Sequence, residues 1–273
     1  MNERDKKIFL GLDEHWKDAL KHFNRDNIVG LFLQGSQNYQ LDYEGSDIDT
    51  KLIITPTFKD ICLNRKAVST TFVRENDEHI DFKDIRLYMD TFRKQNLNFL
   101  EILFTDYFII NSSEYFDQWN RLVERREDIA RMNIYRAVKS MKGIALEKYH
   151  AMEHRYPSKA DIVDKYGYDG KQVSHLIRVD DYLERYIAGE SYESCLRPSS
   201  SKRERIWDYK MLDRIPLEEA RIEASHVVEH AIRIADEFCE KCSDNENQEI
   251  RELLDDVAYN IMKISVEKEL SLK

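Results

Sequence analysis

Two aspartates, Asp47 and Asp49, interrupt an apolar stretch that reads LFLQGSQNYQLDYEGSDIDTKLIITP from Leu31 to Pro56. Residues two apart on a β-strand point to the same face, so a strand here would place the two carboxylates side by side. Such a pair is costly unless solvent or a cation neutralises it, and carboxylates are typical ligands of Mg²⁺. The spacing therefore favours a divalent-metal site.

Gly35 and Ser36 lie upstream, where an apolar run ends in a tight turn. The turn offers backbone N–H groups and a hydroxyl that can hold phosphate oxygens, so turn and carboxylates are the two halves of a nucleoside triphosphate site. A third carboxylate from a neighbouring strand would complete a two-metal site. Asp81 is predicted for this role because it alternates with apolar residues on a strand, whereas Asp84 is predicted to cap the next helix.

The elements that must position these residues follow from the spacing of apolar side chains. The predicted N-terminal helix has Phe9, Leu12, Trp16, Leu20 and Phe23 at spacings of three and four. Strands are predicted over 28–33, 47–55, 69–76 and 79–85, followed by a helix through residue 92. Later segments, at 114–155, 171–188, 216–242 and 247–268, have helical spacing, and loops are predicted at 155–170 and 194–205.

Composition narrows the class of protein. The chain has 273 residues and a net charge of -10, which argues against a protein that coats nucleic acid by bulk electrostatic attraction. It contains no run of about 18 apolar residues, and its first residues, MNERDKKIFLGLDEH, have no signal-peptide core. The four cysteines are too few and too scattered for a disulfide framework. We therefore expect a cytoplasmic protein with no membrane partner.

The combined motif resembles a known signature. Gly35-Ser36, ten intervening residues, then Asp47-Ile48-Asp49, with a later strand acid, resembles that of the DNA polymerase β-like nucleotidyltransferase superfamily. The likeness is greater to the predicted bacterial and phage nucleotidyltransferases related to RNA-repair enzymes. Further stretches resemble that branch, namely IDFKDIRLYMDTFRKQNLNFLEILF, YDGKQVSHLIR and RPSSSKRERIWDYK. The resemblance covers roughly residues 28–235 and leaves the last helix unmatched.

The resemblance implies an α+β fold, with an N-terminal catalytic domain (1–110, a mixed sheet with helices) and a C-terminal α-helical domain (111–273). It implies two Mg²⁺ or Mn²⁺ ions, both bound by Asp47 and Asp49, with Asp81 on the catalytic ion. It also implies transfer of a nucleoside monophosphate from an NTP or dNTP to an acceptor hydroxyl, with release of pyrophosphate. Ser36 and the Gly35-Ser36 backbone would hold the β- and γ-phosphates.

Lys171, His175 and Arg178 are spaced by four and three residues, so they share one face of a predicted helix. The resemblance places this helix across a cleft, between the two domains, from Asp47 and Asp49. Lys171 is then the first candidate for a β/γ-phosphate contact, with Arg178 supporting it and His175 orienting phosphate or acceptor. The alternative is a solvated face, because lysine and arginine on helices are usually exposed.

Other interpretations compete with nucleotidyl transfer. His150–His154 and His226–His230 both fit H-x-x-E-H, a zinc-peptidase pattern. The basic segment from Arg197 to Arg205 could guide a nucleic-acid acceptor or be a solvated loop. An inactive, antitoxin-like regulator on the same fold is a further alternative. The sequence leaves open the acceptor (a nucleic-acid end, a protein hydroxyl, a small molecule or a nucleotide), the base and sugar preference, and the oligomeric state.

Overall fold

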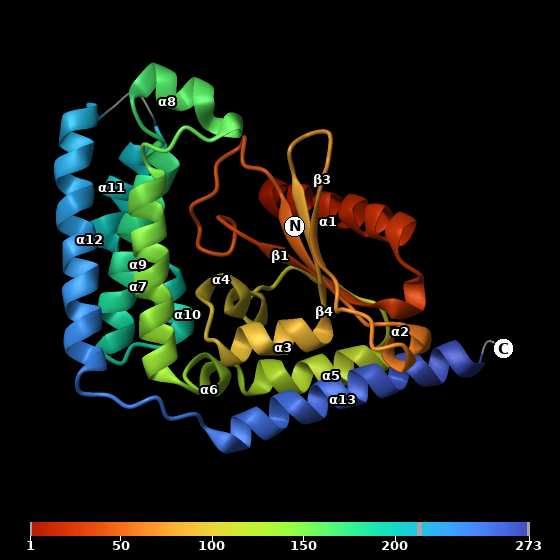
Figure 1. Ribbon diagram of the computed structural model, residues 1–273. Helices are drawn as coiled ribbons and strands as arrows, with labels where there is room; N and C mark the ends of the chain where they lie inside the picture. The colour runs from red at the N-terminus through yellow and green to blue at the C-terminus, as the bar shows by residue number, and fades with distance from the viewer. Residues whose placement is uncertain (1, 212–214, 272–273) are drawn as a thin grey trace. The chain divides into compact units, whose positions relative to one another are not determined.

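The structure is a computed structural model that describes residues 2–211 and 215–271. The chain forms two compact units, of which the first comprises Met1–Met132 and Glu246–Lys273 and the second Asn133–Asn245. The first unit contains a five-stranded mixed sheet and the second is helical, so the predicted α+β class is confirmed (Figure 1). Within these described ranges, none of the helices has the length and apolar character needed to span a bilayer.

The sheet of the first unit has the strand order β3-β4-β2-β1-β5. The strands are β1 (Ile28–Gln34), β2 (Asp49–Ile54), β3 (Ser69–Val73), β4 (His79–Asp84) and β5 (Phe108–Ile110). Neighbouring strands are antiparallel except β2 and β4, which are parallel. Four of these strands correspond to predicted ones, but β2 begins at Asp49 rather than at Asp47, and β5 was not predicted.

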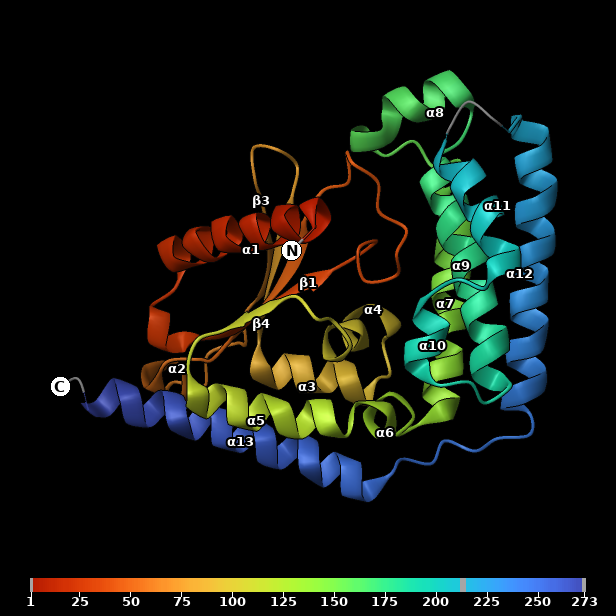
Figure 2. The ribbon, with the colours of Figure 1, turned by 180° about the vertical axis from the view of Figure 1, so that it is seen from behind.

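Helices cover both faces of the sheet. Helix α1 (Glu3–His22) packs on one face, and α3 (Ile85–Arg93), α5 (Ser113–Glu124) and α13 (Gln248–Ser271) lie on the other (Figures 1 and 2). Toward α1 the strands present alternate apolar residues, which form the core with Ile8 and Leu12 of α1; they include Leu31, Leu33, Leu52, Ile80 and Phe82. On the opposite face, the ring centroids of Phe32 and Trp119 of α5 are 4.4 Å apart. Polar residues occupy strand ends, as at Gln34 of β1 and Asp49 of β2.

The last helix of the chain belongs to the first unit. Helix α13 contacts α3 and α5, and its Ser265 Oγ lies 2.6 Å from Thr55 Oγ1, just after β2. Its buried residues, Ile250, Leu254, Val257 and Ile261, recur at spacings of three and four. The short elements of this unit are η1 (Arg25–Asn27), α2 (Phe58–Cys62), α4 (Leu97–Leu100), η2 (Glu101–Leu103) and α6 (Arg126–Ala130).

The second unit is built around α9 (Gly170–Ile187). This helix contacts α7 (Ile134–Ala151), α10 (Tyr192–Leu196), α11 (Ser200–Lys210) and α12 (Leu217–Cys239). Surrounded in this way, α9 buries charged residues as well as apolar ones, among them Arg178, Asp180 and Asp181. Two short elements, η3 (Pro157–Lys159) and α8 (Ala160–Tyr166), precede it.

The compact units differ from the predicted domains 1–110 and 111–273. Residues 111–132 and α13 belong with the sheet, because α5 and α13 pack on its second face. Helical spacing reveals that a helix is amphipathic but not which core receives its apolar face. The loops predicted at 155–170 and 194–205 are wrong in part, since α8 lies in the first and most of the second is helical, in α10 and α11.

Candidate functional site

Strand register gathers polar residues at one end of the sheet. Gln34, the last residue of β1, pairs with Asp49, the first residue of β2, while Lys51 pairs with Asp81 across β2 and β4. Side chains alternate along strands, so all four residues lie on the face opposite α1. The Gly35-Ser36 turn follows Gln34 directly, and the pairing therefore brings this turn to the end of the sheet where Asp49 lies.

Asp47 and Asp49 lie at this end of the sheet but, contrary to the prediction, do not share one strand. Asp47 is exposed in the loop before β2, so strand alternation does not orient it, whereas Asp49 is half-buried at the start of the strand. Asp49 Oδ1 accepts a hydrogen bond of 2.8 Å from the backbone N–H of His79. Between the two acids, the buried Ile48 packs so closely on α1 that a Cβ on Gly11 would lie 2.9 Å from its Cγ1. The buried Ile48 therefore fixes the backbone between two carboxylates that are exposed or partly exposed to solvent.

Asp81 lies on β4, as predicted, and is held by three donors. Lys51 Nζ lies 3.3 Å from its Oδ2, Thr71 Oγ1 donates to its Oδ1 at 2.6 Å, and Gln34 Nε2 lies 3.5 Å from Oδ2. Burial by itself would raise the pKa of Asp81, but the Lys51 charge and the Thr71 hydrogen bond outweigh it, so the pKa lies below its ordinary value. Asp81 is therefore a stable anion in the folded chain.

Asp84 has the role predicted for it. Its side chain accepts a 2.9 Å hydrogen bond from the backbone N–H of Arg86 and forms an ion pair with the Arg86 guanidinium, at the N-terminus of α3. An N-cap carboxylate satisfies an N–H group of the first helical turn that has no partner within the helix. The choice of Asp81 rather than Asp84 as the site carboxylate is consistent with this local geometry.

The Gly35-Ser36 turn holds an acidic partner that sequence reasoning missed. Gly35 has a positive φ of 98°, and its N–H donates a 2.9 Å hydrogen bond to Oε1 of Glu101, which is only 3% exposed. A lone glutamate in the apolar run NFLEILF was the available signal, because a charged residue inside such a run is buried only when it is paired. The Gly35 N–H that was predicted to hold phosphate is therefore engaged by a carboxylate in this structure.

On the α1 side, a buried network supports the start of β2. His15 Nδ1 lies 2.8 Å from Thr50 Oγ1, and His15 Nε2 lies 3.1 Å from Glu78 Oε2. Glu78 Oε1 also accepts a 3.1 Å hydrogen bond from the backbone N–H of Ile48, and Arg74 Nη1 donates to Glu78 Oε2 at 2.6 Å. These hydrogen bonds fix the chain between Asp47 and Thr50 on the side of the sheet that faces α1. Sequence analysis missed this network, although His15 has the helical spacing of the buried residues of α1.

This network predicts a loss of stability in mild acid. Burial lowers the pKa of His15 despite the neighbouring carboxylates of Glu78 and Asp49, and Arg74 adds to the lowering. Below about pH 6.5 the unfolded chain binds a proton at His15 that the folded chain does not, so the free energy of unfolding falls as the pH falls, by up to roughly 1.4 kcal/mol per pH unit.

Urea unfolding between pH 7.5 and 5 measures this dependence. We expect a shallower decline for His15→Gln than for wild type, and a wild-type decline for the exposed control His150→Gln. Equal slopes in all three chains would contradict a buried, neutral His15.

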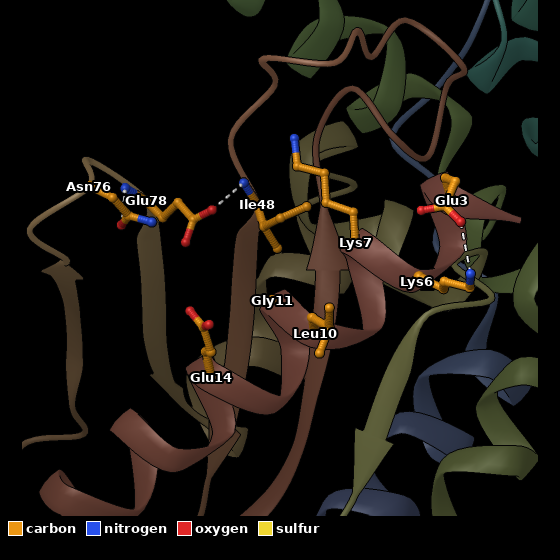
Figure 3. Close-up of a pocket in the computed structure, with 9 residues that line it drawn as sticks. All are labelled: Glu3, Lys6, Lys7, Leu10, Gly11, Glu14, Ile48, Asn76 and Glu78. Carbon is orange, nitrogen blue, oxygen red and sulfur yellow. Dashed lines mark hydrogen bonds and ion pairs between the residues drawn. The ribbon is translucent and has the colours of Figure 1, made fainter.

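A pocket of about 390 Å³ lies on the α1 side of the sheet and is lined in part by Glu78 of this network. Figure 3 shows its lining, which includes Lys7, Gly11 and Glu14 of α1 together with Ile48 and Glu78 from outside that helix. Its ionisable side chains carry both signs of charge. The lining shares Ile48 and Glu78 with the candidate site, and it includes none of the predicted nucleotide-binding residues.

The predicted cations of the second unit lie on α9. Lys171 is exposed in the first turn, His175 is half-buried, and Arg178 is 3% exposed. Burial, with the charges of Arg178 and Lys171, lowers the pKa of His175 well below its ordinary value. The alternative of a solvated face is wrong at Arg178, because neighbouring helices enclose α9. The predicted placement across a cleft from Asp47 and Asp49 stays a prediction.

The competing motifs find little support. Helix α7 ends at Ala151, so His154 does not share its helix with His150, and His230 Nδ1 lies 2.7 Å from Asp180 Oδ1. Arg205 of the basic segment pairs with Glu219 and lies in α11, not in a loop. In the part of the chain that the structure describes, no three His, Cys, Asp or Glu residues are grouped as metal ligands.

Asp47, Asp49 and Asp81 are likewise not grouped as ligands of one metal ion. Asp81 faces a lysine, a threonine and a glutamine rather than the other two acids. The oxygen ligands that Mg²⁺ prefers are nevertheless present at Asp47 and Asp49, on either side of one buried residue. Asp47 and Asp49 therefore offer the type of donor that a divalent ion prefers, whereas Asp81 already has a cation beside it.

Comparisons with known proteins show a distant likeness to a solved structure. No protein-family model matches the chain, and no curated protein is similar to it. The chain is similar to the crystal structure of a nucleotidyltransferase-like protein from Exiguobacterium sibiricum 255-15, with a TM-score of 0.31 and 10% sequence identity, over 83% of this chain and 74% of that one. A likeness at this level carries no conclusion about the reaction.

Proposed function

We propose that this protein is a metal-dependent nucleotidyltransferase, which transfers a nucleoside monophosphate from an NTP or dNTP to an acceptor hydroxyl and releases pyrophosphate. One observation carries the proposal. The antiparallel pairing of Gln34 with Asp49 brings the Gly35-Ser36 turn, to which we assign the phosphates, to the end of the sheet where two carboxylates lie. Carboxylates beside a phosphate-binding turn are the requirements of metal-assisted phosphoryl chemistry.

In this proposal Asp47 and Asp49 hold Mg²⁺ or Mn²⁺, which would neutralise charge on the phosphates when bound. Ile48 and its hydrogen bond to Glu78 keep the two carboxylates in place. Ser36 offers its hydroxyl to the β- and γ-phosphates. Asp81 remains an anion near the acceptor. On α9, Lys171 with Arg178 supplies positive charge for the triphosphate, while a neutral His175 orients phosphate or acceptor.

The test is incubation of the full chain with each labelled NTP and dNTP, with Mg²⁺ or Mn²⁺, followed by mass spectrometry of all products including the protein itself. Pyrophosphate release with addition of a nucleoside monophosphate to any hydroxyl would support the proposal. The same reactions with EDTA, and with Asp49→Asn, serve as controls. Metal-independent release, or release unchanged in Asp49→Asn, would contradict it.

A second candidate is a regulator that binds a nucleotide or a partner without catalysis. Two contacts favour it, because Asp81 is paired with Lys51 and the Gly35 N–H is bound to Glu101. It predicts nucleotide binding by calorimetry with no pyrophosphate released from any of the eight common nucleotides. Turnover with any one of them would exclude it.

Replacing Lys171 by alanine is expected to weaken NTP binding by roughly 1–3 kcal/mol, the usual loss for a charge-assisted hydrogen bond to an anion. Lys171 is exposed, so the melting temperature without ligand should change little. Calorimetry with Mg²⁺ and an NTP measures the effect, with the exposed Lys165→Ala of α8 as the matched control. Equal affinities in both variants would remove Lys171 from the nucleotide site.

A further inference from the structure

Lys51 is an unusual residue for the middle of a strand. It is 3% exposed, yet it carries its charge on the same sheet face as the candidate acids. Its ammonium lies 3.3 Å from Asp81 Oδ2 and 4.2 Å from the centroid of the Phe99 ring. A buried lysine is tolerated only where its charge is compensated, and here the carboxylate and the ring face supply that compensation.

The other contacts of Asp81 complete its coordination without a metal ion. Thr71 donates to Oδ1 at 2.6 Å, while Lys51 and, more weakly, Gln34 approach Oδ2. Asp47 differs, since its carboxylate makes no hydrogen bond or ion pair within residues 2–211 and 215–271 and is exposed to solvent. The acids of the site are therefore unequal, because Asp47 is open to a cation and Asp81 already has one.

We propose that Lys51 is the resident cation of this site, which takes the place of a second metal ion beside Asp81, so that the chain binds a single divalent ion through Asp47 and Asp49. The inference rests on the proposed function for the role of that ion. It replaces the two-ion arrangement that the resemblance implied with one ion and one ammonium group. Asp81 is then a positioning residue for Lys51 rather than a metal ligand.

Displacement of Lys51 by a second ion is opposed by its surroundings. Only 4% of the Lys51 side chain is exposed, so an ammonium pushed off Asp81 would stay buried without its counter-charge. The ammonium of Lys83 lies 4.8 Å from the same Phe99 centroid and adds a second positive charge. Two lysine ammonium groups therefore already lie against one ring at this corner of the site.

Mn²⁺ binding to the full chain without nucleotide tests the inference, with free Mn²⁺ counted by electron paramagnetic resonance. We expect one ion per wild-type chain, one ion with unchanged affinity in Asp81→Asn, and no measurable binding in Asp49→Asn. Two ions per wild-type chain, or an affinity more than about tenfold weaker in Asp81→Asn, would overturn it. The double variant Lys51→Met/Asp81→Asn removes both buried charges, guards against misfolding of the single variant, and should also bind one ion.

Lys51→Met is expected to change the number of bound ions, unlike Asp81→Asn. With the ammonium gone, Asp81 is free to join a metal site, and we expect a second ion to bind. The matched control is Lys83→Met, because Lys83 contacts the same ring but donates its hydrogen bond to Ser69 rather than to Asp81. This variant should bind one ion. A single ion in Lys51→Met together with weakened binding in Asp81→Asn would assign Asp81 to the metal.

The outcomes separate the two proposals. Because binding is counted without turnover, a chain that binds one ion but transfers no nucleotide keeps this inference and loses the proposed reaction. A chain that turns over nucleotides with two ions bound loses this inference alone. A chain that binds no ion without nucleotide overturns this inference, and the proposed reaction is then decided by the turnover assay alone.

Discussion

Asp49→Asn is expected to lower nucleotidyl transfer roughly a thousandfold while the fold survives. The estimate assumes that a bound ion contributes several kcal/mol to the transition state and that each 1.4 kcal/mol is a factor of ten in rate. The fold survives because asparagine retains the Oδ1 atom that accepts the hydrogen bond from the His79 N–H. Asp47→Asn should behave alike, since Asp47 is exposed.

Asp84→Asn is the matched control for this experiment. Asp84 lies at the end of the neighbouring strand and caps α3, a role that asparagine fills nearly as well. It loses only the ion pair with the partly exposed Arg86, so its rate should stay within about threefold of wild type. Steady-state rates and melting curves are measured together. Wild-type turnover in Asp49→Asn would remove the metal role from this acid, and a collapse of Asp84→Asn alone would move it to the end of β4.

The second large effect is expected for Gly35→Ala. Gly35 has φ 98°, where an L-residue costs about 1–2 kcal/mol, yet a Cβ there would meet only Gln37 Oε1, at 3.8 Å. The cost is therefore one of backbone strain rather than of collision. Relief of that strain would turn the Gly35 N–H away from Glu101 and shift the Ser36 hydroxyl, so we expect KM for the nucleotide to rise about tenfold or more.

Gly143→Ala provides the contrasting substitution. Gly143 lies in the interior of α7, where an added Cβ meets nothing within 4 Å, so alanine should stabilise the chain by roughly 0.5–1 kcal/mol. Urea unfolding and nucleotide titration of both variants give the comparison. Equal stabilities, with KM unchanged in Gly35→Ala, would show that the turn does not depend on its glycine.

Local features of the site were predictable from sequence. Asp81 alternates with Ile80 and Phe82 on β4, and Asp84 comes directly before an amphipathic helix, so each position follows from its neighbours. The prediction for Asp47 was wrong about where a strand begins. Asp47 was placed on a strand that begins two residues later, because no local signal marks where pairing with β1 stops.

The buried charges escaped prediction because their partners are distant in sequence. Lys51 pairs with Asp81, 30 residues later, and Glu101 binds the N–H of Gly35, 66 residues earlier. Before the strand register is known, either charged residue reads as solvated. Arg178 shows the same limitation, since its helical spacing with Lys171 was evident but the helices that enclose α9 were not.

The place of α13 has a consequence for synthesis. The second unit interrupts the first between Met132 and Glu246, and the two crossings of the chain meet where Asn247 N–H donates to the Met132 carbonyl oxygen at 2.8 Å. At about 5–20 residues per second, the ribosome needs on the order of 10 s to pass from Met132 to the end of α13. During that time α5 lacks the helix that covers it, and the whole of the second unit is synthesised before α13 begins. We therefore expect the inserted unit to fold first and the sheet-bearing unit to need chaperone protection until its last helix arrives.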